Sequence, residues 1–141
     1  MQIDKDLIES KIDIIQRNLE FLNEYRYVDE EGFSSSYKDV QAVKYSLLEV
    51  VEACIDIASH IISARGFERA ESYAEMFQIL GKKNIINPNL AERLSDMARF
   101  RNILVHGYAK VDNLKVLEIV KEELKDIDDF VEEILQWGCI D

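Results

Sequence analysis

The chain has few of the residues that form turns, break helices or cross-link a fold. Its 141 residues include one proline, five glycines and two cysteines. So few turn-forming residues disfavour a sheet-rich fold built on many tight turns, because such folds need glycine and proline between short strands. Two cysteines, Cys54 within an apolar stretch and Cys139 near the end, make neither a disulfide framework nor a zinc site. We expect Cys54 to be a small core residue.

Long apolar runs and a cationic leader are also missing. No run approaches the roughly 20 apolar residues that span a bilayer. The start of the chain, Met1-Gln2-Ile3-Asp4-Lys5-Asp6, has the wrong charge for a signal peptide. These absences predict a protein without a membrane segment that stays in the cytoplasm.

Positive charge is scarce and unevenly placed. The net charge of −11 argues against a protein that coats nucleic acid. The segment from Gly81 to Lys110 nevertheless carries six basic residues and two acidic ones, so it is net +4 while the rest of the chain is −15. Two interpretations remain open: a local basic surface that engages a polyanion, or ordinary charge segregation on solvated faces.

What the chain does have is helical periodicity along most of its length. Apolar residues recur at three- and four-residue spacing over 4–25, 37–64, 87–106 and 113–137, and a short helix is expected over 72–80. Ser72, Asn87 and Asp112 are predicted N-terminal caps, while Gly66 and Gly107 end helices. Residues 28–36 are expected to form a loop. We predict one all-α domain over residues 1–141, an up-and-down four-helix bundle with one extra short helix.

The helix predicted over 37–64 is apolar around most of its circumference but has one narrow polar strip. Its members lie three or four residues apart and share a face: Glu49, Glu52, Asp56, His60 and Ser63. Charges on such a helix need solvent or cationic partners. Either the strip orients a neighbouring site by hydrogen bonds, or it is a solvated edge on which Asp56 and His60 form an i,i+4 pair.

Chemistry concentrates at the end of the helix predicted over 87–106. The string Arg101-Asn102-Ile103-Leu104-Val105-His106-Gly107-Tyr108 brings together a permanent cation, an imidazole and a phenol. An arginine offers a planar fork of donors to a phosphate, and a histidine titrates near neutral pH. This pair has the parts for metal-independent RNA cleavage. The alternative is that neither residue is catalytic, the arginine capping the helix and the histidine having a structural role.

Helical geometry limits this idea. Five residues turn through about 500°, so Arg101 and His106 lie roughly 140° apart on a regular helix. Asn102 and His106, four apart, share a face. Either the last turn departs from helical geometry before His106, or the site is assembled between two chains of a two-fold dimer. A dimer also supplies the second imidazole that concerted acid–base chemistry requires.

The string from Arg101 to Tyr108 resembles the Arg-x4-His-x-Tyr motif of HEPN-domain proteins, specifically the HepT-like toxins of toxin–antitoxin pairs. The helix with Glu49 to Ile62, the chain length and the helix order are also similar to that family. The resemblance implies a two-fold homodimer that cleaves RNA without a metal or other cofactor. It implies catalytic Arg101 and His106, with support from Asn102. The polar strip itself, and not the resemblance, adds Glu52 and Asp56 as further supporting candidates.

The same resemblance implies a protein partner and an off-switch. The partner is a small MntA-like nucleotidyltransferase antitoxin that neutralises the toxin by adding AMP units to Tyr108. Phosphates added beside the cleft occupy the cationic site and repel RNA. Two other hypotheses on the function stay open: a non-catalytic HEPN module that binds a nucleotidyltransferase or a nucleotide, and a purely structural helical protein.

Overall fold

The computed structural model describes residues 2–107 and 111–140, the side chains of 139 and 140 excepted, and within them every regular element is a helix. The all-α prediction is confirmed. The helices are α1 (Lys5–Asn23), α2 (Glu30–Ser35), α3 (Tyr37–Arg65), α4 (Tyr73–Lys82), α5 (Pro88–His106), α6 (Asn113–Glu122) and α7 (Leu124–Ile140). None of these described helices is long and apolar enough to cross a membrane.

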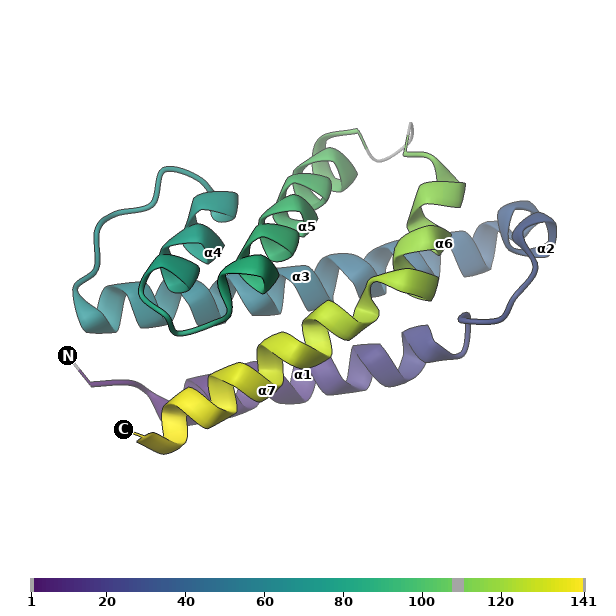
Figure 1. Cartoon of the computed structure of the whole chain (residues 1–141). Helices are drawn as coiled ribbons and strands as arrows, with labels where there is room; N and C mark the ends of the chain where they lie inside the picture. Colours follow the sequence, from purple (N-terminus) through teal and green to yellow (C-terminus); the bar gives the residue numbers. More distant parts are fainter. Residues whose placement is uncertain (1, 108–110, 141) are drawn as a thin grey trace.

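Helix α3 is the central helix, and α1, α2, α4, α5 and α6 pack against it, while α7 packs on α5 and α6 (Figure 1). Helix α1 lies along one side of α3, whereas α4 and α5 form an antiparallel pair on another. The end of α7 lies beside the start of α1, where the two helices line a shared groove. The most deeply buried large side chains of the helices come from α1, α3, α4, α5 and α7: Ile15, Leu22, Leu47, Ile57, Ile61, Phe77, Leu80, Leu90, Leu94, Leu104 and Phe130.

The predicted helix ends are confirmed by their caps. The hydroxyl of Ser72 accepts a hydrogen bond from the N–H of Glu75, and the carboxylate of Asp112 accepts one from the N–H of Leu114. Gly66 ends α3 in the left-handed conformation, with φ of 65°, which glycine adopts without steric cost. Cys54 is buried in the core as predicted, and burial raises the pKa of its thiol.

Two predictions about the helices were wrong. Residues 28–36 are not all loop, because Asp29 caps α2 through the N–H of Gly32 and Phe33 buries its ring. The last helix is two helices, interrupted at Glu123. The interruption lets α6 pack on α2 and α3 while α7 packs on α5. Lys121 fixes α6 there by donating to the carbonyl oxygen of Val28 at 2.6 Å.

Candidate active site

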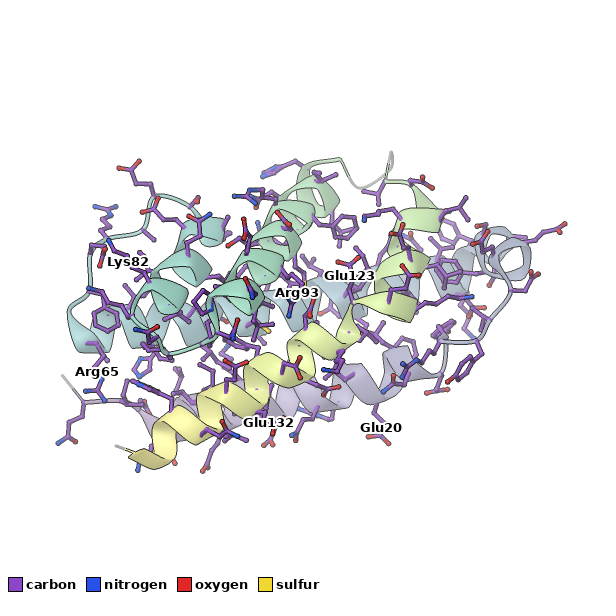
Figure 2. All side chains as sticks on the ribbon, in the orientation of Figure 1. Glu20, Arg65, Lys82, Arg93, Glu123 and Glu132 are labelled. Carbon is purple, nitrogen blue, oxygen red and sulfur yellow. The ribbon has the colours of Figure 1, made fainter. Side chains whose placement is uncertain are left out.

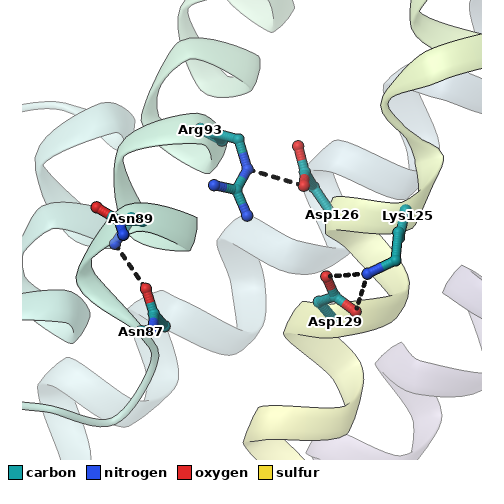
Figure 3. A network of polar contacts seen from close by, with 6 residues as sticks. All are labelled: Asn87, Asn89, Arg93, Lys125, Asp126 and Asp129. Carbon is teal, nitrogen blue, oxygen red and sulfur yellow. Dashed lines mark hydrogen bonds and ion pairs between the residues drawn. The ribbon is translucent and has the colours of Figure 1, made fainter.

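Helix α5 carries the candidate catalytic residues and stays helical to its end. Asn87 and Pro88 start it, the asparagine side chain accepting from the N–H of Asn89 at 2.8 Å (Figure 3). The helix runs through His106, and the N–H of Gly107 donates to the carbonyl oxygen of Ile103 at 2.8 Å. The expectation that the last turn departs from helical geometry is therefore wrong. Arg101 and His106 remain about 140° apart around the axis.

Arg101 is held by three elements. Its Nη2 donates to Oε2 of Glu52 on α3 at 3.1 Å, and its Nη1 donates to Oδ1 of Asn102 at 3.2 Å. The guanidinium carbon lies 5.0 Å from the centre of the Tyr73 ring, which belongs to α4. The Arg101 side chain is only 15% exposed, and its Nε is buried without a hydrogen-bond partner.

This arrangement leaves donors available on Arg101. A guanidinium has five N–H groups, two on each terminal nitrogen and one on Nε. Since each terminal nitrogen uses one N–H on the residues above, one N–H remains on Nη1 and one on Nη2. Two such donors match two oxygens of a phosphate. Glu52 and Asn102 thus fix the cation without consuming its binding capacity.

His106 differs from Arg101 in its surroundings. It lies exposed at the C-terminal end of α5 and makes no hydrogen bond or ion pair with the residues that the structure describes. Ile103, three residues earlier on the same face, is 59% exposed, and Val105 is also exposed. His106 is thus exposed, and within one chain it lies on a different face of α5 from Arg101.

The polar strip of α3 contributes one residue to Arg101. Glu52 makes the contact described above, whereas Asp56 pairs with Lys11 of α1 at 2.9 Å. The alternative of an Asp56–His60 pair is wrong, because Nε2 of His60 accepts from the backbone N–H of Asp4 at 2.8 Å. His60 anchors the start of α1 and lies outside the candidate site.

Asp56 nevertheless borders the space next to Arg101. A cavity of about 210 Å³ lies there, and its lining comes from three helices: Glu52, Ile55, Asp56 and Ser59 of α3, Tyr73 and Met76 of α4, and Arg101 of α5. Sequence reasoning missed Tyr73. Its position after a capping serine indicates a helix start, and only the packing of α4 on α5 brings its ring to Arg101.

The basic segment does not form a free cationic surface in the described part of the chain. Lys82 and Lys83 both pair with Glu68, at 3.3 and 3.5 Å. Figure 2 shows Lys82 and Arg65 at the same end of the molecule, where α3 ends. The arginines of the segment are also paired. Arg93 pairs with Asp126 (Figure 3), Arg99 with Asp96 and Arg101 with Glu52. This pairing favours charge segregation over a broad polyanion surface.

Tyr108 lies outside the described residues. Among the described residues no group of three or more His, Cys, Asp or Glu side chains is placed to hold a metal ion. Within one chain the fold brings Arg101 together with Glu52, Asn102 and Tyr73. His106 is not part of this group.

Known proteins resemble this chain over nearly its whole length. A protein from Shewanella oneidensis named mRNA nuclease HepT is 31% identical, covering 92% of this chain and 96% of that protein. One from Aphanizomenon flos-aquae named tRNA nuclease HepT is 28% identical, covering 94% and 90%. A solved structure described as the tri-AMPylated Shewanella oneidensis HEPN toxin in complex with MNT antitoxin is 30% identical, with a TM-score of 0.85, covering 93% and 98%.

The family model described as Ribonuclease HepT-like matches residues 15–134. This span includes α3, α4 and α5, the three helices that supply Arg101 and the side chains around it. On this match the chain belongs to the HepT-like ribonuclease family.

Proposed function

We propose that this protein is the toxin of a toxin–antitoxin pair, a metal-independent endoribonuclease that acts in the cytoplasm. Arg101 and His106 are its catalytic residues, and Glu52 and Asn102 position the arginine. The observation that carries the proposal is the state of Arg101. It is a nearly buried cation held on its edges by two side chains, with one N–H left on each terminal nitrogen. Family membership supports the same assignment.

The reaction follows from the two side chains. An imidazole of His106 takes the proton from a ribose 2′-hydroxyl, and the resulting oxygen attacks the adjacent phosphorus. The bond from phosphorus to the 5′-oxygen breaks, and the protonated imidazolium of the second His106 gives its proton to that oxygen. The products are a 2′,3′-cyclic phosphate and a free 5′-hydroxyl. Arg101 stabilises the negative charge that develops on the phosphate oxygens.

The proposed site needs two copies of the chain. In one copy, His106 is about 140° around α5 from Arg101, and the helix is regular between them. A two-fold dimer places the motifs of both copies around one cleft and supplies two imidazoles. Exposed apolar side chains near His106 in the last turn of α5, those of Ile103 and Val105, favour burial against a second copy.

The proposed partner is an MntA-like nucleotidyltransferase antitoxin that adds AMP to Tyr108. The solved relative at 30% identity is described as AMPylated and as a complex with an antitoxin, which supports this part of the proposal. Tyr108 is two residues from His106, so added phosphates enter the same cleft as the substrate. They occupy the donors of Arg101 and repel RNA.

The proposal is tested by RNA cleavage in the presence of EDTA. We expect the wild-type protein to cut, and Arg101→Ala and His106→Ala to lose at least about a hundredfold in rate. The matched controls are Arg99→Ala, an exposed arginine on the same helix, and His60→Ala, the chain's other histidine. We expect both controls to cut like the wild type.

Two results contradict the proposal. If Arg101→Ala and His106→Ala cut at the wild-type rate, the site is elsewhere. If the wild-type protein leaves RNA uncut yet binds a nucleotidyltransferase tightly, the non-catalytic module is the better description.

A further inference from the structure

The Tyr73 side chain has no role in starting the helix it belongs to. Ser72 supplies the cap of α4, accepting from the N–H of Glu75 at 3.1 Å, so the residue after it is free to serve another purpose. Tyr73 is 37% exposed, and its ring lies under the guanidinium of Arg101, 5.0 Å from the guanidinium carbon. We propose that Tyr73 is a positioning residue for Arg101, holding the plane of the guanidinium for phosphate binding. This inference rests on the proposed function.

The contact is fixed because α4 and α5 are tightly joined. The buried hydroxyl of Ser95 on α5 lies 2.9 Å from the carbonyl oxygen of Ala74, the residue next to Tyr73. At the other end of α4 the helices approach so closely that a Cβ on Gly81 would lie 2.6 Å from the Cβ of Ala91. Tyr73 is therefore carried on a rigid support rather than on a loop.

The ring restrains a motion that the other contacts leave open. Glu52 and Asn102 hold edges of the guanidinium through its terminal nitrogens, and Glu52 is itself 46% exposed. A half-exposed ion pair is a weak restraint by itself. The electron-rich face of an aromatic ring attracts a cation placed over it, and this attraction resists tilting of the guanidinium. With the plane fixed, the remaining N–H groups of Nη1 and Nη2 keep one direction.

Fixing that direction matters because the two donors act on charge that develops during the reaction. Donors that are already aligned require no reorganisation when the phosphate becomes more negative. A tilt that displaces them lowers the rate of the chemical step more than the affinity for RNA. The expected signature of losing Tyr73 is therefore a lower kcat with little change in KM.

The chain contains a matched control for Tyr73. Tyr37 is also the first residue of a helix and also follows a capping serine, Ser36, but it is 79% exposed. We expect Tyr73→Leu to lower kcat roughly tenfold, in line with the strength of a partly desolvated cation–ring contact. Tyr73→Phe keeps the ring face and should retain the wild-type kcat. Tyr37→Leu should also match the wild type.

A second variant keeps the test decisive if Tyr73→Leu folds poorly. Pentafluorophenylalanine at position 73 has nearly the shape of phenylalanine but a reversed ring quadrupole, so it repels the cation. We expect it to reduce kcat relative to Tyr73→Phe at an unchanged midpoint of thermal unfolding. Equal kcat for these two variants overturns the proposal, as does a wild-type kcat for Tyr73→Leu or an equal loss for Tyr73→Phe and Tyr73→Leu.

These outcomes are separate from failure of the proposed function. If Arg101→Ala is inactive and both Tyr73→Leu and the fluorinated variant cut normally, only the positioning role fails. If Arg101→Ala cuts normally, the proposed function fails, whatever the Tyr73 variants do.

Discussion

Replacement of Gly81 by alanine should destabilise this protein, although the same change in most helices stabilises. Gly81 lies inside α4, where alanine is favoured over glycine by about 1 kcal/mol. The added Cβ would, however, lie 2.6 Å from the Cβ of Ala91, whereas nonbonded carbons prefer about 3.5–4.0 Å. The two helices must separate by about 1 Å to relieve this contact.

The size of this destabilisation depends on whether the atoms next to the added Cβ can move. The Ala91 methyl group has no rotamer to change, so only the helix backbones can move. Overpacking of this kind costs about 1–3 kcal/mol, and a rigid neighbour places Gly81→Ala near the upper end. Subtracting the gain in helix propensity leaves a net loss of about 2 kcal/mol in the free energy of unfolding.

The assay is urea unfolding of Gly81→Ala beside a matched control. Gly138 lies in α7 with nothing within 4 Å of its added Cβ, so Gly138→Ala should gain about 0.5–1 kcal/mol. The double variant Gly81→Ala, Ala91→Gly restores the space and should recover stability beyond the sum of the single changes. A Gly81→Ala protein as stable as the wild type, with Gly138→Ala stabilised, refutes the reasoning.

Three other outcomes are expected. Burial raises the pKa of Glu123, so the folded state binds more protons than the unfolded state between the two pKa values. The cost of burying the ionised Glu123 carboxylate is absent below the unfolded pKa, grows as pH rises through this window and is complete above the folded pKa. Glu123→Gln should thus be more stable than the wild type at pH 7 and equal to it at low pH, as measured by thermal unfolding at both. An RNA with 2′-deoxyribose at the cut site should resist cleavage. The matching all-ribose RNA should be cut, and mass spectrometry should detect 2′,3′-cyclic phosphate ends on its products. Tyr108→Phe should cut RNA like the wild type and gain no AMP from a nucleotidyltransferase and ATP, whereas AMP on the Phe variant contradicts the assigned site.

Periodicity and end signals were enough to predict most of the fold. Ser72, Asn87 and Asp112 each cap the helix that was expected, since a cap depends on residues within one turn. Helix α2 has only six residues, too few for a period to be visible, and it depends on burial of Phe33. The break at Glu123 leaves no glycine or proline signal because packing of α6 and α7 on different neighbours causes it.

The candidate site was only partly predictable, for a similar reason. Arg101, Asn102 and His106 are close in sequence, so one motif identifies them. Glu52 was expected from its place on a polar strip, and its 3.1 Å contact with Arg101 agrees with that interpretation. Asp56 and Tyr73 depend on which helices become neighbours: Asp56 pairs with α1, and Tyr73 reaches α5.

The central claim is that two copies of the chain form one cleft whose reaction uses the His106 imidazole of each copy. It is tested most directly by mixing wild-type protein with increasing fractions of His106→Ala protein and measuring RNA cleavage after subunit exchange, with native mass spectrometry to count mixed dimers. A mixed dimer retains both arginines but only one of the two imidazoles. We predict mixed dimers as inactive as His106→Ala dimers, so that the cleavage rate falls with the square of the wild-type fraction. A rate that falls in direct proportion to the wild-type fraction would contradict the shared site and place all the catalytic residues of each site on one chain.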